Sequence, residues 1–177
     1  MINEYYCNNK ILKIMKNKLR QDNVIELQQF LKKEFVGNIE KKIKGLKFKR
    51  EEKLMSHSYS YSDDEKTIQK ISEEIIPFIM EVIPIKNIDI SIVKMEHKDY
   101  ILVHEKKHKI FILDVTTTWN DESGGNIIFT DTRGNGTIIQ SKCNSLIISN
   151  GKFRFFIKYI NHHAAKKAKY YIIGRFQ

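Results

Sequence analysis

The chain has 177 residues and a mass of 21.0 kDa, and 41% of its residues are hydrophobic. This length fits a single domain, and this apolar content can offset the entropy lost on folding, which excludes a disordered chain. The net charge of +10 favours anionic partners, including nucleic acid. Cys7 and Cys143 are too few for a disulfide framework and have no partners at zinc-ligand spacing, so we expect a reducing compartment.

The N-terminus lacks the basic and then apolar pattern of a secretion signal. The longest apolar run, residues 75–85, is interrupted by Pro77, Glu81 and Pro84, and it is too short to cross a bilayer. We therefore expect a cytoplasmic or otherwise intracellular protein without a signal peptide, a transmembrane segment or a membrane partner.

The first part of the chain, residues 1–85, is predicted to be mainly helical. Apolar residues recur at helical spacing in residues 11–19, 35–46 and 68–82, with lysines on the other faces of the first two segments. Between the last two segments, Ser56–Asp64 lacks apolar periodicity and is predicted to be a polar loop in which Asp63 or Asp64 caps the next helix. Pro77 is expected to bend that helix.

From residue 88 the apolar period changes to two, which is typical of β-strands. Residues 88–92 are followed by seven further short runs, at 99–104, 109–118, 126–130, 137–140, 144–149, 152–160 and 169–176. Glycine and asparagine fall between several runs, where turns require them. One domain, residues 1–177, is predicted, with an α+β layout in which the N-terminal helices pack on one sheet of a β-core formed by residues 86–177.

Four segments of the β-half occur in an order that carries a family resemblance. They are Asp99–His104, Trp119–Gly125, Asn144–Ile148 and Lys169–Phe176. This set resembles the prolyl-4-hydroxylase-like branch of the 2-oxoglutarate/Fe(II)-dependent dioxygenases, and Asn23–Arg50 resembles the N-terminal helix of that family. The resemblance implies a double-stranded β-helix of the jelly-roll or cupin type, and a hydroxylase that uses Fe(II) and 2-oxoglutarate on a substrate such as a protein.

Such an enzyme holds Fe(II) with two imidazoles and one carboxylate, and a cation binds the far carboxylate of 2-oxoglutarate. By resemblance, His104 is the first metal ligand and Lys169 the 2-oxoglutarate anchor. Lys106 stands two residues after His104, where the family has aspartate, and an ammonium has no lone pair to offer iron. The usual spacing places the second histidine near Lys158.

Two alternatives for the metal ligands stay open. His162 and His163 lie a few residues beyond Lys158, and either would serve if the connecting turn is short. They are equally compatible with two surface histidines beside a lysine-rich turn. His97 and Asp99 form a literal His-x-Asp pair, which offers both ligand types on one face of a strand.

Three functions are therefore compatible with the sequence. The first is a working dioxygenase, and the second is a catalytically inactive oxygenase-fold binding module that has lost its metal. The third is nucleic-acid binding through the basic ends of the chain, where aromatic and cationic residues alternate. The residues that suggest this third function are Phe153, Arg154, Phe155, Lys158 and Tyr159.

Overall fold

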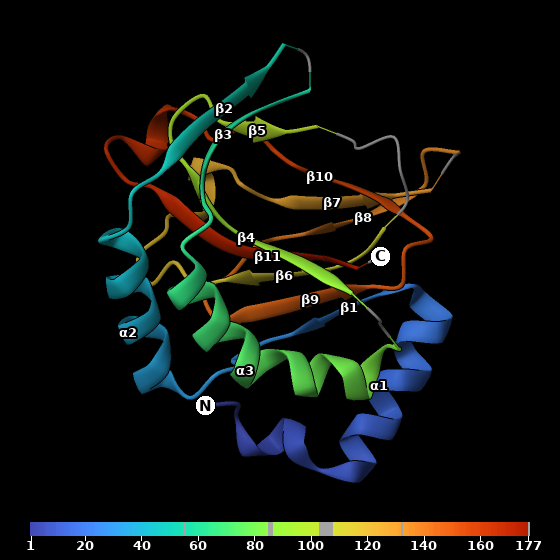
Figure 1. The fold of residues 1–177 in the computed structure, drawn as a ribbon. Coiled ribbons are helices and arrows are strands. Elements are labelled where there is room, and N and C mark those ends of the chain that lie inside the picture. The colour runs from blue at the N-terminus through green and yellow to red at the C-terminus, as the bar shows by residue number, and fades with distance from the viewer. Residues whose placement is uncertain (55, 85–86, 103–107, 132, 177) are drawn as a thin grey trace.

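The computed structural model describes residues 1–54, 56–84, 87–102, 108–131 and 133–176, and Figure 1 shows their arrangement. The helices are α1 (Asn9–Asp22), α2 (Lys33–Lys44) and α3 (Glu65–Val82), with short 3-10 turns η1 (Glu4–Cys7), η2 (Asp121–Ser123) and η3 (His162–Ala164). The strands are β1 (Val24–Leu27), β2 (Lys49–Lys53), β3 (His57–Ser62), β4 (Ile88–Met95), β5 (Tyr100–Ile101), β6 (Lys109–Asp114), β7 (Ile127–Thr130), β8 (Gly136–Ile139), β9 (Ser145–Ser149), β10 (Arg154–Ile157) and β11 (Lys169–Phe176).

The strands form two antiparallel layers that share β3. One layer runs β1-β9-β6-β11-β4-β3, and the other runs β3-β5-β10-β7-β8. β3 pairs with β4 through residues 60–62 and with β5 through residues 57–58, so it joins the two layers, while β2 covers its other edge. The eight runs predicted after residue 88 correspond to β4–β11, and the expected α+β layout with a jelly-roll core is confirmed.

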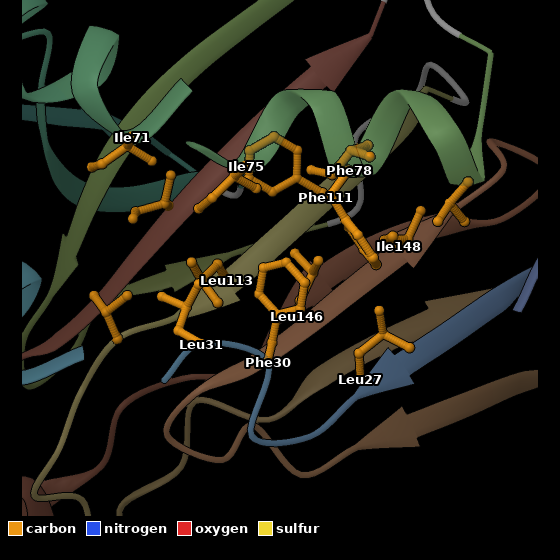
Figure 2. Packing of buried hydrophobic residues seen from close by; sticks show 14 of the residues in the cluster. Leu27, Phe30, Leu31, Ile71, Ile75, Phe78, Phe111, Leu113, Leu146 and Ile148 are labelled. Carbon is orange, nitrogen blue, oxygen red and sulfur yellow. The ribbon is translucent and has the colours of Figure 1, made fainter. Parts of the chain in front are cut away.

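Side chains alternate along β11 between the barrel interior and the helices. Tyr171 and Ile173 belong to the apolar cluster between the two layers, whereas Ile172 and Phe176 belong to the cluster under the helices. In that second cluster, Ile71 and Ile75 of α3 lie above Phe111, Leu113 and Leu146 of the larger layer (Figure 2). The barrel interior is therefore closed off from the helical side, and a site inside it must be built from strand residues and loops.

Residues 1–85 contain all three described α-helices, and they also contain three strands that the sequence did not predict. Asn23–Arg50 contains β1 as well as α2, and β1 forms because it pairs with β9 along its whole length. The predicted loop at Ser56–Asp64 is instead the buried strand β3. Its serines and aromatic residues alternate, and tertiary pairing on both edges turns this polar alternation into a strand.

Two finer expectations concern α3. Asp64 caps this helix, because its carboxylate accepts a hydrogen bond from the Thr67 amide at 2.9 Å, as predicted. The helix continues through Pro77 to Val82. Among the described helices, none is long and apolar enough to cross a membrane.

Two glycines give a direct test of how tightly the helix-facing side of β11 packs against β6. A Cβ added at Gly174 would lie 2.1 Å from Cε1 of the buried Phe111 ring, whereas one added at Gly37 in α2 meets nothing within 4 Å. Gly174→Ala is therefore expected to destabilise the protein by about 1–3 kcal/mol through overpacking. Gly37→Ala is expected to stabilise it by roughly 0.5–1 kcal/mol, since glycine is a poor helix former. Urea unfolding measures both, and equal effects of the two changes would contradict this packing.

Candidate functional site

The most distinctive polar feature inside the barrel is a buried ion pair between Lys169 and Asp114. Lys169 begins β11 and Asp114 ends β6, and the two strands are paired so that Tyr171 lies opposite Asp114. The Lys169 ammonium nitrogen lies 3.1 Å from Asp114 Oδ2, and each side chain is only 1% exposed. The residue that the sequence assigns to 2-oxoglutarate binding is therefore already paired with an anion of the chain.

Both members of this pair have further polar partners. Lys169 Nζ donates to the Ser141 carbonyl at 2.9 Å and lies 4.9 Å from the centre of the Trp119 ring. Asp114 Oδ2 accepts from the Ser141 hydroxyl at 2.6 Å, and its Oδ1 accepts from the Thr116 amide at 2.9 Å. Hydrogen bonding compensates the desolvation of buried charges only when it is this complete. The arrangement is consequently self-sufficient, with the ammonium and the carboxylate satisfied by protein groups.

The negative charge of Asp114 also affects the pKa of two neighbouring side chains, Tyr171 and Cys143. Burial and the charge of Asp114 raise the pKa of Tyr171 well above 10, and its hydroxyl donates to the Gly125 carbonyl at 2.7 Å. Burial, followed by the charge of Asp114, also raises the pKa of the Cys143 thiol to about 11. A Cβ at Gly125 would lie 3.0 Å from Lys169 Cδ, and its φ of 78° favours glycine. The turn at Gly125 therefore lies directly against the Lys169 side chain.

The alternative ligand pair, His97 and Asp99, is not assembled as a pair of donors. Asp99 is 1% exposed, and the Arg50 guanidinium holds both of its oxygens, at 2.9 Å from Nη1 and 2.7 Å from Nη2. Asp99 Oδ2 also accepts from the Glu96 amide at 2.8 Å. His97 is exposed and packs edge-on against the Tyr159 ring. Asp99 thus fixes the turn between β4 and β5, and its lone pairs are taken.

Of the other candidate metal ligands, two lie at the surface and one lies outside the described residues. His162 and His163 are exposed in η3, with ring centres 4.1 Å apart, and the Asn161 side chain accepts from the His163 amide. His104 and Lys106 lie outside the described residues. Across the described ranges, no group of three His, Cys, Asp or Glu side chains is placed to hold a metal ion.

The aromatic and basic residues that suggested nucleic-acid binding are also divided by the fold. Phe155 is buried in the barrel, where it packs against Phe129, and Phe153 and Arg154 are partly buried. Lys158 and Tyr159 are exposed. A stacking platform needs several exposed rings along one surface, and this segment presents Tyr159 alone.

Sequence reasoning missed Asp114, although a signal for it is present. The run Lys109–Asp114 is apolar in its interior, and its last residue points into the barrel together with Ile110 and Ile112. A carboxylate at an inward position needs a buried cation. Lys169, at the inward-facing start of another apolar strand, is the only described lysine buried this deeply.

Solved structures give the comparison for this geometry, since no family model and no curated protein matches the chain. A prolyl-4-hydroxylase from Pseudomonas putida superposes with a TM-score of 0.77 and 8% identity, over 94% of this chain and 98% of that one. The fold is that of the prolyl-4-hydroxylase-like 2-oxoglutarate/Fe(II) oxygenases.

Two further structures agree with this fold. A prolyl hydroxylase from Trichoplax adhaerens, in complex with a peptide fragment of the hypoxia inducible factor oxygen degradation domain, has a TM-score of 0.76 and 11% identity, over 98% of this chain and 91% of that one. A 2OG-Fe(II) oxygenase family oxidoreductase from Burkholderia pseudomallei has a TM-score of 0.73 and 9% identity, with coverage of 96% and 92%. The architecture expected from the family resemblance is therefore confirmed.

The described residues do not fit the cofactor and metal of these oxygenases. A carboxylate of 2-oxoglutarate brought to Lys169 would meet the Asp114 carboxylate on the same ammonium, and two carboxylates sharing one site repel each other. Among the described candidate metal ligands, Asp99 is held by Arg50, and His97, His162 and His163 are exposed on separate turns.

Substitution at the alternative pair tests the role of Asp99. Asp99→Ala is expected to destabilise the protein by roughly 1–3 kcal/mol, because the Glu96 amide and the Arg50 guanidinium lose their acceptor. His97→Ala is the matched control and is expected to stay within about 0.5 kcal/mol, as for other exposed positions. Chemical denaturation with and without a divalent metal measures both. Stabilisation of the wild type by the metal that is lost in His97→Ala would contradict the structural role.

Proposed function

We propose that this protein is an oxygenase-fold binding module in which the Asp114 carboxylate takes the place of the 2-oxoglutarate carboxylate on Lys169. The observation that carries the proposal is the ion pair itself, at 3.1 Å and 1% exposure for both side chains. An enzyme that recruits 2-oxoglutarate through this lysine needs an ammonium that is free to accept a carboxylate, and here the partner is built into β6.

Exchange of Asp114 for an external ligand is unfavourable for a physical reason. Displacing the carboxylate from Lys169 would leave it inside the barrel with only Ser141 and the Thr116 amide as partners. Leaving one member of a buried pair uncompensated costs about 3–5 kcal/mol. A free dicarboxylate would have to supply at least that much additional binding energy.

The ligand positions inferred from the sequence support the same proposal. Lys106 and Lys158 stand where the family resemblance expects an aspartate and a histidine, and an ammonium donates no electron pair to iron. A polypeptide is the ligand class that we favour for the module, because the Trichoplax adhaerens structure holds a peptide on a fold of the same shape.

One observation favours the second candidate, a working dioxygenase. Lys169 lies at the start of β11 inside the barrel, where the resemblance places the 2-oxoglutarate anchor. This candidate requires Asp114 to leave the lysine when the cofactor enters. The following experiment separates it from the binding module.

Thermal unfolding of the wild-type protein under anaerobic conditions distinguishes the two functions. A ligand that binds only the native state raises its stability, by about 2.7 kcal/mol at one hundred times its dissociation constant. We expect no saturable shift with 2-oxoglutarate together with Fe(II) or Mn(II), and no succinate on admission of oxygen. Saturable stabilisation by the combination, together with succinate formation, would establish the dioxygenase instead.

Removal of the Asp114 carboxylate tests directly whether it takes the place of a cofactor carboxylate on Lys169. Asp114→Ala is expected to lose about 3–5 kcal/mol, and formate is expected to restore part of it, because its carboxylate fits the vacated space beside Lys169. Melting temperatures in sodium formate and sodium chloride of equal ionic strength measure the rescue. Asp22→Ala, at an exposed position in α1, is the matched control and is expected to show no formate-specific shift.

The double variant Asp114→Ala/Lys169→Met adds the decisive comparison. It removes both charges, so it is expected to be more stable than Asp114→Ala alone and to be insensitive to formate. Equal formate effects in the single and double variants would show that Lys169 does not hold the carboxylate, and the proposal would then be wrong.

A further inference from the structure

A groove lies on the helical side of the molecule, away from the Lys169–Asp114 pair. It is formed by α2, the turn after it and α3, which lie at the left and centre of Figure 1, and its volume is about 950 Å³. Five described apolar side chains line it: Met1 ahead of η1, Phe35 and Ile39 from α2, Leu46 from the turn, and Ile71 from α3. Ile39 and Ile71 are largely covered, whereas Phe35 and Leu46 are half-buried. The groove is therefore a recess with an apolar floor and not a projecting apolar patch.

Four exposed lysines stand on both sides of this floor. Lys41 and Lys42 come from α2, and Lys66 and Lys70, one helical turn apart, come from α3. Lys42 and Lys70 face each other across the groove so closely that the charge of Lys70 lowers the pKa of Lys42. Like charges on facing helices repel, and an anion between them relieves the repulsion.

Unlike a neighbouring lysine, these four lysines have no acidic partner among the salt bridges of the described residues, so they can bind an external anion. Lys44, also on α2, lies 3.0 Å from the Glu40 carboxylate and is paired with it. In the described part of the chain, no salt bridge engages Lys41, Lys42, Lys66 or Lys70. Glu74 is the one acidic residue among the described residues that line the groove, so the rim carries an excess of positive charge.

We propose that this groove binds an amphipathic helix of a partner protein, with an apolar ridge against the floor and acidic residues against the four lysines. Helices dock in this way on apolar grooves, through residues spaced three and four apart. The proposal goes beyond the binding-module function because it concerns a surface outside the barrel and needs neither Lys169 nor Asp114.

The chemistry of the groove favours a protein helix over the other anionic partners of a basic surface. Single-stranded nucleic acid stacks its bases on exposed aromatic rings, and among the described residues Phe35 is the only aromatic one that lines the groove. A bilayer surface receives apolar side chains that project from a helix, whereas this floor is recessed between two helices. The apolar floor and the cationic rim together are complementary to an amphipathic helix with an acidic face.

Fluorescence anisotropy with three labelled peptides of about four helical turns tests the proposal on the full chain. The first peptide carries leucine at helical i, i+3, i+4 and i+7 spacing with glutamate elsewhere, the second has lysine in place of glutamate, and the third is a scrambled version of the first. We expect saturable, salt-sensitive binding of the first peptide, about tenfold or more tighter than of the other two.

Charge reversal at the rim locates the binding. Lys42→Glu/Lys70→Glu is expected to weaken binding of the acidic peptide by about tenfold or more. Leu46→Gln, on the floor, is expected to weaken this binding severalfold. Lys13→Glu/Lys18→Glu on α1 makes the same change in net charge at exposed positions outside the groove, and it is expected to change affinity by less than about twofold. Far-UV circular dichroism and melting temperature identify variants that do not fold, and Lys42→Gln/Lys70→Gln replaces the reversal in that case.

Several outcomes would overturn the proposal. The proposal is wrong if the acidic peptide binds no more tightly than its scrambled version, or if the α1 control variant loses as much affinity for it as the groove variant. Tighter binding of a single-stranded oligonucleotide, or of phosphatidylserine vesicles, through Lys42 and Lys70 would assign the groove to that partner instead. None of these results depends on formate rescue at Asp114, so failure here is distinguishable from failure of the proposed function.

Discussion

An ammonium group enclosed in an apolar barrel must be neutralised within the barrel, and this constraint governs the interior of the protein. Lys169 is 1% exposed and cannot extend to solvent from its position at the start of β11. Asp114 meets it because β6 and β11 are adjacent and in register, so that the end of one strand lies beside the beginning of the other. Ser141 then contacts both charges, through its carbonyl and its hydroxyl.

The rest of the scaffold holds these two strands in place. On one side, the helices pack on β6, β9 and β11 through the cluster that contains Ile75 and Phe111. On the other, β3 links the larger layer to β5 and the smaller layer, which closes the barrel around the pair. Trp119 and the Gly125 turn cover the lysine from the loop between β6 and β7. Two apolar clusters thus fix the strands whose ends make the polar site.

The sequence predicted the elements that local patterns determine. The eight later strands follow from a period of two, and the helices follow from apolar stripes at three and four. β1 and β3 were not predicted because their formation depends on pairing with other strands. β1 pairs with β9, and β3 pairs with β2, β4 and β5. The Ser and Tyr alternation in β3 is a strand pattern, but without knowledge of its neighbours its polarity favours a loop.

The resemblance pointed to Lys169 but not to its partner. It assigned this lysine to 2-oxoglutarate binding, whereas the structure buries it and pairs it with Asp114, which lies 55 residues earlier and carries no motif. A cofactor site and an internal ion pair both place a carboxylate at hydrogen-bonding distance from the buried lysine. They differ in whether that carboxylate belongs to the chain, and here Asp114 at the end of β6 supplies it from within the chain. On the proposed function, the jelly-roll barrel keeps its fold and its buried cation without a cofactor, and binding rests on exposed residues of the helices, which lie outside the two apolar clusters.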